Sequence, residues 1–156
     1  MIDKEKLPYR KCAGMMLVNK DGFVFVAKRI DTKAEAWQMP QGGVDDGEDV
    51  ARAAMRELEE EIGTTKARIL KESESWLPYD LPDHLIGKMW KGKYRGQTQK
   101  WFLMEFLGKD SDINIETGQP EFSEWKWVEP HLLPDIIVPF KKDLYIQVLN
   151  EFKEHL

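Results

Sequence analysis

The chain has 156 residues, of which 42% are hydrophobic and 33% are charged, a composition typical of a soluble globular domain. Its net charge of −5 argues against binding along duplex DNA, but it leaves room for a basic pocket that holds one terminal phosphate group. The one cysteine, Cys12, excludes an intrachain disulfide and fits a reducing compartment. The N-terminus has no apolar signal-peptide core, and no apolar run approaches the length of a membrane span. We expect one cytoplasmic domain over residues 1–156, monomeric or weakly dimeric.

Strands and helices alternate along the chain. Apolar runs at 12–19 and 23–29 flank Lys20-Asp21-Gly22, whose Asp-Gly pair predicts a hairpin turn. The glycine-rich segment 37–47 predicts a loop, 48–62 a helix, and 66–73 a strand. Residues 75–96 contain three prolines and are expected to be mostly loop, followed by strands at 98–107 and 124–128. The final segment, 139–153, predicts an amphipathic helix with Phe140, Leu144, Val148 and Phe152 on one stripe. This order favours an α/β sheet covered by helices.

The helix predicted at 48–62 carries an unusual charge pattern. Asp45 and Glu48 precede it with the spacing of a capping box, and Gly63 ends it. At 100° per residue, Ala51, Met55, Leu58 and Ile62 form the stripe expected to face the core. Three glutamates lie on the opposite side, with spacing i, i+3, i+4: Glu57, Glu60 and Glu61.

Acidic residues in this arrangement destabilise a helix. Like charges four residues apart repel, and acids in the last turn oppose the helix dipole, each by a few tenths of a kcal/mol. One interpretation is an acidic face in contact with solvent. The other is a site for a hard divalent cation, Mg²⁺ or Mn²⁺, which carboxylate oxygens bind well.

The segment from residue 42 to residue 64 resembles the Nudix box, G-x5-E-x7-R-E-U-x-E-E-x-G-U, where U is a bulky aliphatic residue. It matches in register at Gly42, Glu48, Arg56, Glu57, Leu58, Glu60, Glu61 and Gly63. Thr64 departs from the final aliphatic position, which concerns packing after the helix. The resemblance implies an α/β/α sandwich with a mixed sheet and a loop–helix–loop catalytic element. It also implies hydrolysis of a phosphoanhydride bond assisted by Mg²⁺ or Mn²⁺.

The resemblance assigns roles to the acidic and basic residues of this element. Glu57, Glu60 and Glu61 are expected to bind the metal, and Arg56 is expected to pair with Glu48 and brace the loop against the helix. Glu121 resembles a distal acid that adds a metal ligand or acts as the base, although a plain loop glutamate is the alternative.

The match extends beyond the box, at 37–43, 96–102, 120–130 and 139–145. These segments are similar to bacterial RNA pyrophosphohydrolases, a group that overlaps with dinucleoside polyphosphate hydrolases. The resemblance implies substrate contacts for several further residues. Phosphates are expected to meet Arg10, Arg29, Lys28 and Lys141, whose charges suit them. Phe140 either stacks on a base or packs in the core. Tyr79 lies where dinucleoside polyphosphate hydrolases place a tyrosine, and Gln41 is expected to help orient the metal site.

Three substrate classes remain open at this stage. The enzyme is expected to convert 5′-triphosphorylated or diphosphorylated RNA to 5′-monophosphorylated RNA, to split diadenosine tetraphosphate into ATP and AMP, or both. A pyrophosphatase that clears the nucleoside triphosphate pool would need a base-specific pocket that the sequence does not reveal. A catalytically silent nucleotide-binding module is disfavoured, because all three helix acids are present.

Overall fold

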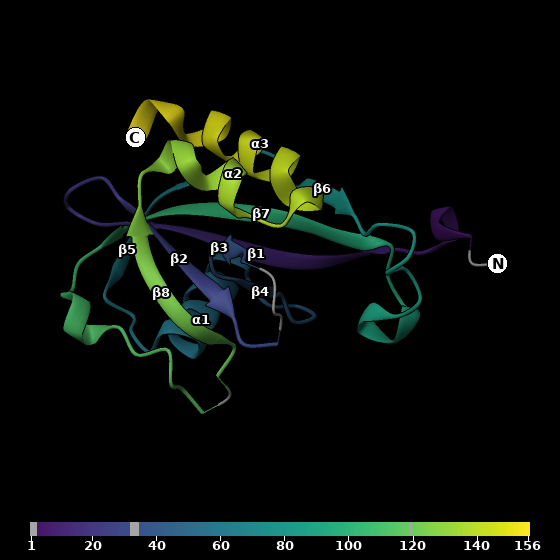
Figure 1. The fold of residues 1–156 in the computed structure, drawn as a ribbon, viewed down its shortest axis with the longest axis horizontal. Helices are drawn as coiled ribbons and strands as arrows, with labels where there is room; N and C mark the ends of the chain where they lie inside the picture. Colours follow the sequence, from purple (N-terminus) through teal and green to yellow (C-terminus); the bar gives the residue numbers. More distant parts are fainter. Residues whose placement is uncertain (1–2, 32–34, 119) are drawn as a thin grey trace.

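The computed structural model describes residues 3–31, 35–118 and 120–156 (Figure 1). Over these residues, eight strands form one mixed sheet and three α-helices cover it. The elements are β1 (Tyr9–Val18), β2 (Val24–Arg29), β3 (Trp37–Gln38), β4 (Gln41–Gly43), α1 (Val50–Ile62), β5 (Ala67–Glu72), β6 (Leu77–Asp80), β7 (Gly96–Phe106), β8 (Phe122–Val128), α2 (Leu133–Ile136) and α3 (Lys142–Phe152).

The sheet is built around the parallel pair β1 and β7. Their register runs from Tyr9 opposite Gly96 to Val18 opposite Glu105. The other pairings are antiparallel: β5 and β6 flank β7, β4 and β2 flank β1, and β3 and β8 flank β2. A parallel pair needs a long crossover connection, and α1 lies within the one that joins β1 to β7.

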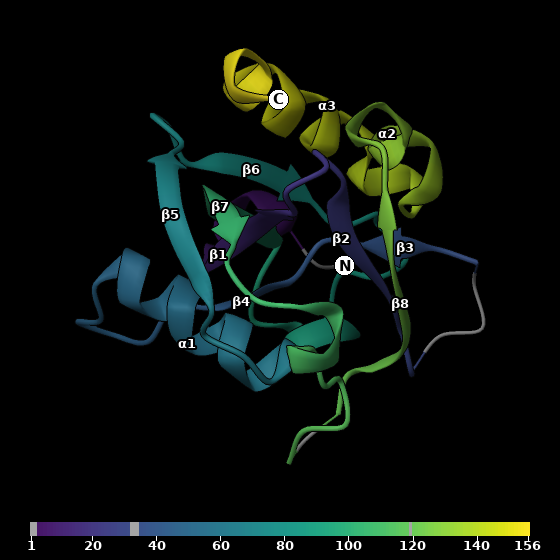
Figure 2. The ribbon, with the colours of Figure 1, turned by 90° about the vertical axis from the view of Figure 1, so that its left-hand side faces the viewer.

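Helices cover both faces of the sheet, as Figure 2 shows: α1 lies on one side, and α2 and α3 lie on the other. One apolar cluster packs beneath α3 around Trp101 and Tyr145, and a second packs beneath α1 around Leu58 and Phe102. All side chains from Cys12 to Leu17 are buried, because β1 is covered on both faces. The predicted α/β sandwich is confirmed.

The predicted strands are present with shifted ends, and the hairpin between β1 and β2 is confirmed. Gly22 occupies the turn at φ +84°, a conformation that glycine adopts without a steric penalty. Two loop predictions were wrong in part. Segment 37–47 contains β3 and β4, and segment 75–96 contains β6 and a 3₁₀ turn at Met89–Gly92. Strands this short carry too little periodicity to be recognised.

Helix α1 begins at Val50, two residues later than predicted. Its N-cap is Asp49, whose carboxylate accepts a hydrogen bond from the Arg52 backbone N–H at 3.2 Å. The predicted helix start after Asp45 was therefore wrong, although half of the predicted capping box is present: the Glu48 carboxylate accepts a hydrogen bond from the Asp45 N–H at 3.0 Å, within the loop. Gly63 ends the helix in the left-handed conformation, as predicted.

At the C-terminus, α3 begins at Lys142, after a 3₁₀ turn at Pro139–Lys141. Leu144, Val148 and Phe152 are buried as predicted, whereas Phe140 is only partly buried. No helix in the part of the chain that the structure describes is long and apolar enough to cross a membrane.

Candidate active site

The acidic residues of α1 share one side of the helix and line one cavity, but they do not form one solvent-facing surface, which goes against the first of the two interpretations. Glu61 is only 3% exposed and the Glu57 side chain 13% exposed, whereas the Glu60 side chain is 58% exposed. Ala53 is also buried, because β4 packs on this side of the helix. Helix α1 is therefore covered at Glu57 and Glu61 as well as along its apolar stripe, whereas Glu60 stays in contact with solvent.

The buried Glu61 carboxyl lies close to the carboxyl of Glu121, an exposed residue. Burial raises the pKa of the Glu61 carboxyl well above its ordinary value, and the nearby Glu121 carboxyl raises it further. Burial also raises the pKa of Glu57, and the charge of Glu60 adds to that effect. The site therefore holds acids whose ionised forms are disfavoured unless a positive charge lies between them.

Gly42 explains how Glu57 reaches its position. A Cβ atom at residue 42 would overlap the Glu57 carboxyl group, so only glycine lets that carboxyl lie against β4. Gly43 plays a similar part for Arg10: a Cβ atom there would lie 2.7 Å from an Arg10 guanidinium nitrogen. The two glycines of β4 thus allow the acidic Glu57 side chain and the basic Arg10 side chain to lie close to the backbone of this strand.

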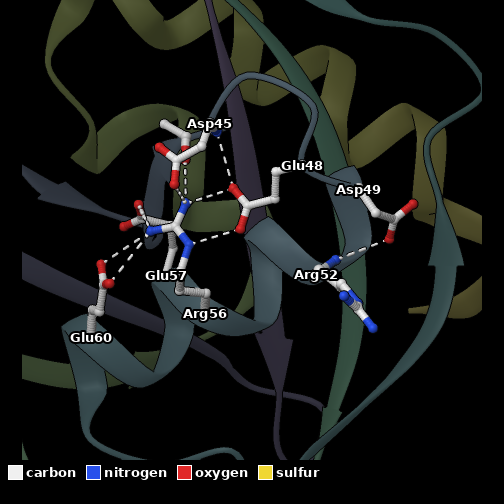
Figure 3. Close-up of polar contacts among 8 residues, drawn as sticks. Asp45, Glu48, Asp49, Arg52, Arg56, Glu57 and Glu60 are labelled. Carbon is white, nitrogen blue, oxygen red and sulfur yellow. Dashed lines mark hydrogen bonds and ion pairs between the residues drawn. The ribbon is translucent and has the colours of Figure 1, made fainter.

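Arg56 connects the loop before α1 to the acids on the helix (Figure 3). Its Nε and Nη2 donate hydrogen bonds to the two Glu48 carboxylate oxygens at 2.9 and 2.8 Å. Nη2 also donates to the Gly43 carbonyl, and Nη1 donates to Glu57 Oε1, both at 2.9 Å. The Arg56 guanidinium lowers the pKa of Glu48 to about 2. Arg56 therefore fixes the positions of both Glu57 and the loop.

Two cavities meet at these acids. The acidic cavity is lined by Glu57, Glu59, Glu60, Glu61, Thr117, Gly118 and Glu121. The main cavity shares Glu57 and Glu121 with it and is otherwise lined by Arg10, Arg29, Gln41, Gly42, Gly43, Tyr79, Leu81, Met89, Trp90, Gln97, Phe140 and Lys141. The main cavity is thus lined by acidic side chains, which it shares with the acidic cavity, and by basic side chains.

The chemistry of the acidic cavity fits a divalent cation. In the described residues, two buried side-chain oxygens have no hydrogen-bond partner, Glu61 Oε2 and Thr117 Oγ1, and both residues line this cavity. In the same residues, no three acidic, histidine or cysteine side chains are close enough together to form a complete metal-binding group as they stand. Binding of a cation by Glu57, Glu60, Glu61 and Glu121 therefore stays a prediction.

Six of the seven residues expected to contact substrate line the main cavity: Arg10, Arg29, Gln41, Tyr79, Phe140 and Lys141. Lys28 does not line it. Its ammonium lies 2.7 Å from a Glu35 carboxylate oxygen and 3.7 Å from one of Glu124. The register of β2 with β8 shifts between Lys28 and Arg29, and of these two residues only Arg29 lines the cavity.

Two aromatic rings and a partly buried lysine lie together in the lining of the main cavity. The Tyr79 and Phe140 ring centroids lie 6.0 Å apart, and Lys141 Nζ lies 5.2 Å from the Tyr79 centroid. Burial lowers the pKa of Lys141 to about 8, and the charge of Arg29 contributes. Phe140 contacts the core cluster while also lining the cavity, so both of its proposed roles fit the geometry.

The main cavity is also lined by four residues that were not expected from the sequence: Leu81, Met89, Trp90 and Gln97. A signal existed for Gln97. Gln97 and Gln99 lie in a buried strand, with 2% and 1% of their surfaces exposed. Uncharged amides in such a strand indicate either a hydrogen-bond network or a polar site.

Comparisons with known proteins agree with this architecture. The NUDIX domain family model matches residues 8–148. The chain is 58% identical to an RNA pyrophosphohydrolase of Sphingopyxis alaskensis, over 97% of this chain and 98% of that protein. It is 55% identical to an RNA pyrophosphohydrolase of Rickettsia canadensis, over 94% of this chain and 91% of that protein.

Solved structures show the same fold at low sequence identity. A C. elegans Ap4A hydrolase superposes with a TM-score of 0.67 at 24% identity, covering 94% of this chain and 99% of that one. An E. coli dihydroneopterin triphosphate pyrophosphohydrolase gives 0.68 at 19% identity, covering 90% and 96%. Because the family model covers most of the chain and the relatives match it over nearly its whole length, the chain belongs to the NUDIX domain family and is a Nudix hydrolase.

Proposed function

We propose that this Nudix hydrolase removes pyrophosphate or phosphate from the 5′ end of triphosphorylated or diphosphorylated RNA, leaving a 5′ monophosphate. The observation that carries the proposal is the main cavity, where Arg10, Arg29 and Lys141 face Glu57 and Glu121. A polyphosphate needs cationic groups along its length and acids that hold a counter-cation at the bond to be cleaved. The names of the relatives described above support RNA as the substrate.

The proposed cation is Mg²⁺, or Mn²⁺, held by Glu57, Glu60, Glu61 and Glu121. Nudix enzymes generally use divalent metal ions, and hard carboxylate oxygens suit these two. When bound, the ion polarises a phosphoryl oxygen and lowers the pKa of an attacking water molecule. Bringing a cation to the acidic cavity also removes the repulsion between Glu61 and Glu121.

The protein's own residues position the substrate and move the proton. Arg10, Arg29 and Lys141 hold the phosphate oxygens, and the 5′-terminal base stacks on Phe140 beside Tyr79. The oxygen of water forms a bond to phosphorus while the bond to the bridging oxygen breaks. A carboxylate of the acidic cavity accepts the proton of that water, and pyrophosphate or phosphate leaves.

The test compares kcat/KM on 5′-triphosphorylated RNA and on diadenosine tetraphosphate, with and without Mg²⁺. We expect Mg²⁺-dependent release of pyrophosphate or phosphate from RNA, with a clearly higher kcat/KM for RNA. A higher value for the dinucleotide, with ATP and AMP as products, would assign the cavity between Tyr79 and Phe140 to dinucleoside polyphosphates instead. Hydrolysis of free nucleoside triphosphates alone would indicate a pyrophosphatase that clears the nucleotide pool. Binding of these substrates without hydrolysis would indicate a catalytically silent nucleotide-binding module. The proposed substrates are cytoplasmic molecules, and we place the enzyme there.

A further inference from the structure

A chain of three glutamine side chains lies beside the main cavity. Gln97 and Gln99 are on β7 and Gln41 is on β4. Gln99 Nε2 donates one hydrogen bond to Gln97 Oε1 at 2.7 Å and another to Gln41 Oε1 at 3.3 Å. Gln41 and Gln97 line the cavity, whereas Gln99 does not and is 1% exposed. The buried amide therefore connects the two that border the cavity.

Such a chain has two possible polarities. An amide has a donor end and an acceptor end of nearly the same shape. If all three side-chain amides were rotated by about 180°, so that each oxygen and nitrogen exchanged places, Gln41 and Gln97 would donate to Gln99. The same pairs would then be hydrogen-bonded in the opposite direction. The two arrangements differ in what faces the cavity: amino groups in one and carbonyl oxygens in the other.

Trp101 removes this ambiguity. Its indole Nε1–H donates a hydrogen bond to Gln99 Oε1 at 2.9 Å. An indole N–H is only a donor, so the oxygen of Gln99 must face Trp101 and its amino group must face Gln41 and Gln97. The side-chain oxygens of Gln41 and Gln97 then face Gln99, which leaves the amino groups of these two residues on the side away from Gln99. Neither side-chain nitrogen donates a hydrogen bond to another residue within the described ranges.

The indole is held rigidly enough to impose this polarity. Trp101 is 1% exposed and packs edge-on against Tyr145, with ring centroids 5.9 Å apart. Gly14 supplies the space on the neighbouring strand, because a Cβ atom there would overlap the indole ring. The ring is therefore packed from both sides, and its N–H cannot turn away from Gln99.

We propose that Trp101, acting through Gln99, holds the Gln41 and Gln97 side chains as hydrogen-bond donors to the phosphate oxygens of the substrate. Trp101 and Gln99 are positioning residues, and Gln41 and Gln97 make the contacts. The inference rests on the proposed function, since it needs a polyphosphate in the main cavity. With the reverse polarity, two carbonyl oxygens would face the anionic substrate, which would lose two charge-assisted hydrogen bonds.

The first measurement uses the unaltered protein and inorganic pyrophosphate. In ¹⁵N-edited NMR spectra, we expect pyrophosphate to shift the side-chain NH₂ resonances of Gln41 and Gln97 strongly and that of Gln99 little. The Trp101 indole N–H should exchange slowly with solvent. If saturating pyrophosphate leaves the Gln41 and Gln97 resonances unmoved, the proposal is overturned.

The second measurement reverses the polarity by Gln99→Glu. A carboxylate accepts at both oxygens, so it accepts from Trp101 and also from the amino groups of Gln41 and Gln97. We expect the Kd for pyrophosphate and the KM for substrate to rise roughly tenfold, with kcat changed much less. Losing one hydrogen bond to a charged group weakens binding by about this factor. Gln99→Met, which adds no charge, should give a smaller rise in the same direction. Gln147→Glu, at an exposed position of α3, is the control for the added charge.

The outcomes separate this inference from the proposed function. If pyrophosphate shifts the two resonances and Gln99→Glu weakens its binding, the inference stands even when RNA proves not to be the substrate. If RNA is hydrolysed normally but folded Gln99→Glu and Gln99→Met bind pyrophosphate as tightly as the unaltered protein, the inference fails and the proposed function stands.

Discussion

Replacing Glu61 by glutamine should stabilise the protein while abolishing its hydrolytic activity. Glu61 is 3% exposed, its Oε2 has no hydrogen-bond partner among the described residues, and it faces the Glu121 carboxyl. A buried polar atom without a partner costs about 1–3 kcal/mol of folding free energy. An amide at residue 61 would donate to Glu121 and remove this cost. For a domain of this size, 1 kcal/mol changes the melting temperature by about 2–4 °C, so we expect a rise of roughly 2–12 °C.

The pH dependence of this stabilisation shows whether the ionisation of Glu61 is its cause. The folded-state pKa of Glu61 is raised above its unfolded value of 4.5, so its ionisation destabilises the fold above that value and has no such effect below it. Calorimetry in EDTA should therefore show the stabilising effect of Glu61→Gln at pH 8 and little effect at pH 4. Glu59→Gln, at an exposed position on the same helix, is the matched control. A lower melting temperature for Glu61→Gln at pH 8 without divalent ions would refute the reasoning.

Three further predictions concern the same site. Glu57→Gln should lose most hydrolysis of RNA and keep its circular dichroism spectrum, and normal turnover in Mg²⁺ would exclude α1 as the metal site. Gly42→Ala should lower kcat at least tenfold and also the melting temperature, because its Cβ atom would displace the Glu57 carboxyl. Gly118→Ala, where a Cβ atom meets open space, should leave the melting temperature unchanged. Lys141, with a pKa of about 8, loses its charge as the pH rises from 7 to 9, so KM should rise over that range, and Lys141→Arg should abolish the rise. A KM that rises equally in both proteins would contradict this assignment.

The register of the catalytic helix could be predicted from sequence because its signals are local. Gly63 requires a left-handed conformation, and Leu58 and Ile62 mark the buried stripe. The contact between Arg56 and Glu48 followed from the resemblance, and the structure shows it as two hydrogen bonds. The N-terminus was misplaced because Asp49, as well as Asp45 and Glu48, can cap a helix, and local spacing does not choose between them.

The burial of Glu61 could not be predicted, because it depends on a strand far outside the helix. A helical wheel shows which residues share a side, but not what covers that side. Strand β4 has only three residues, two of them glycine, and it still pairs with β1 and packs against α1. Similarly, Tyr79 was placed in a loop because β6 has four residues and includes Pro78. Only its pairing with β7 turns Tyr79 inward.

The destabilising features of this site are connected, which argues that they serve one purpose. Glu61 is buried and Glu57 partly buried on a helix where acids are unfavourable, and Gly42 supplies the space for Glu57 at the expense of backbone entropy. Arg56 neutralises these acids only in part, because it divides its hydrogen bonds among Glu48, the Gly43 carbonyl and Glu57, and it donates none to Glu61 within the described residues. A site selected for stability would have paired or replaced Glu61. The remaining negative charge lies where the acidic and main cavities meet, and a divalent cation with a polyphosphate is the combination that would balance it.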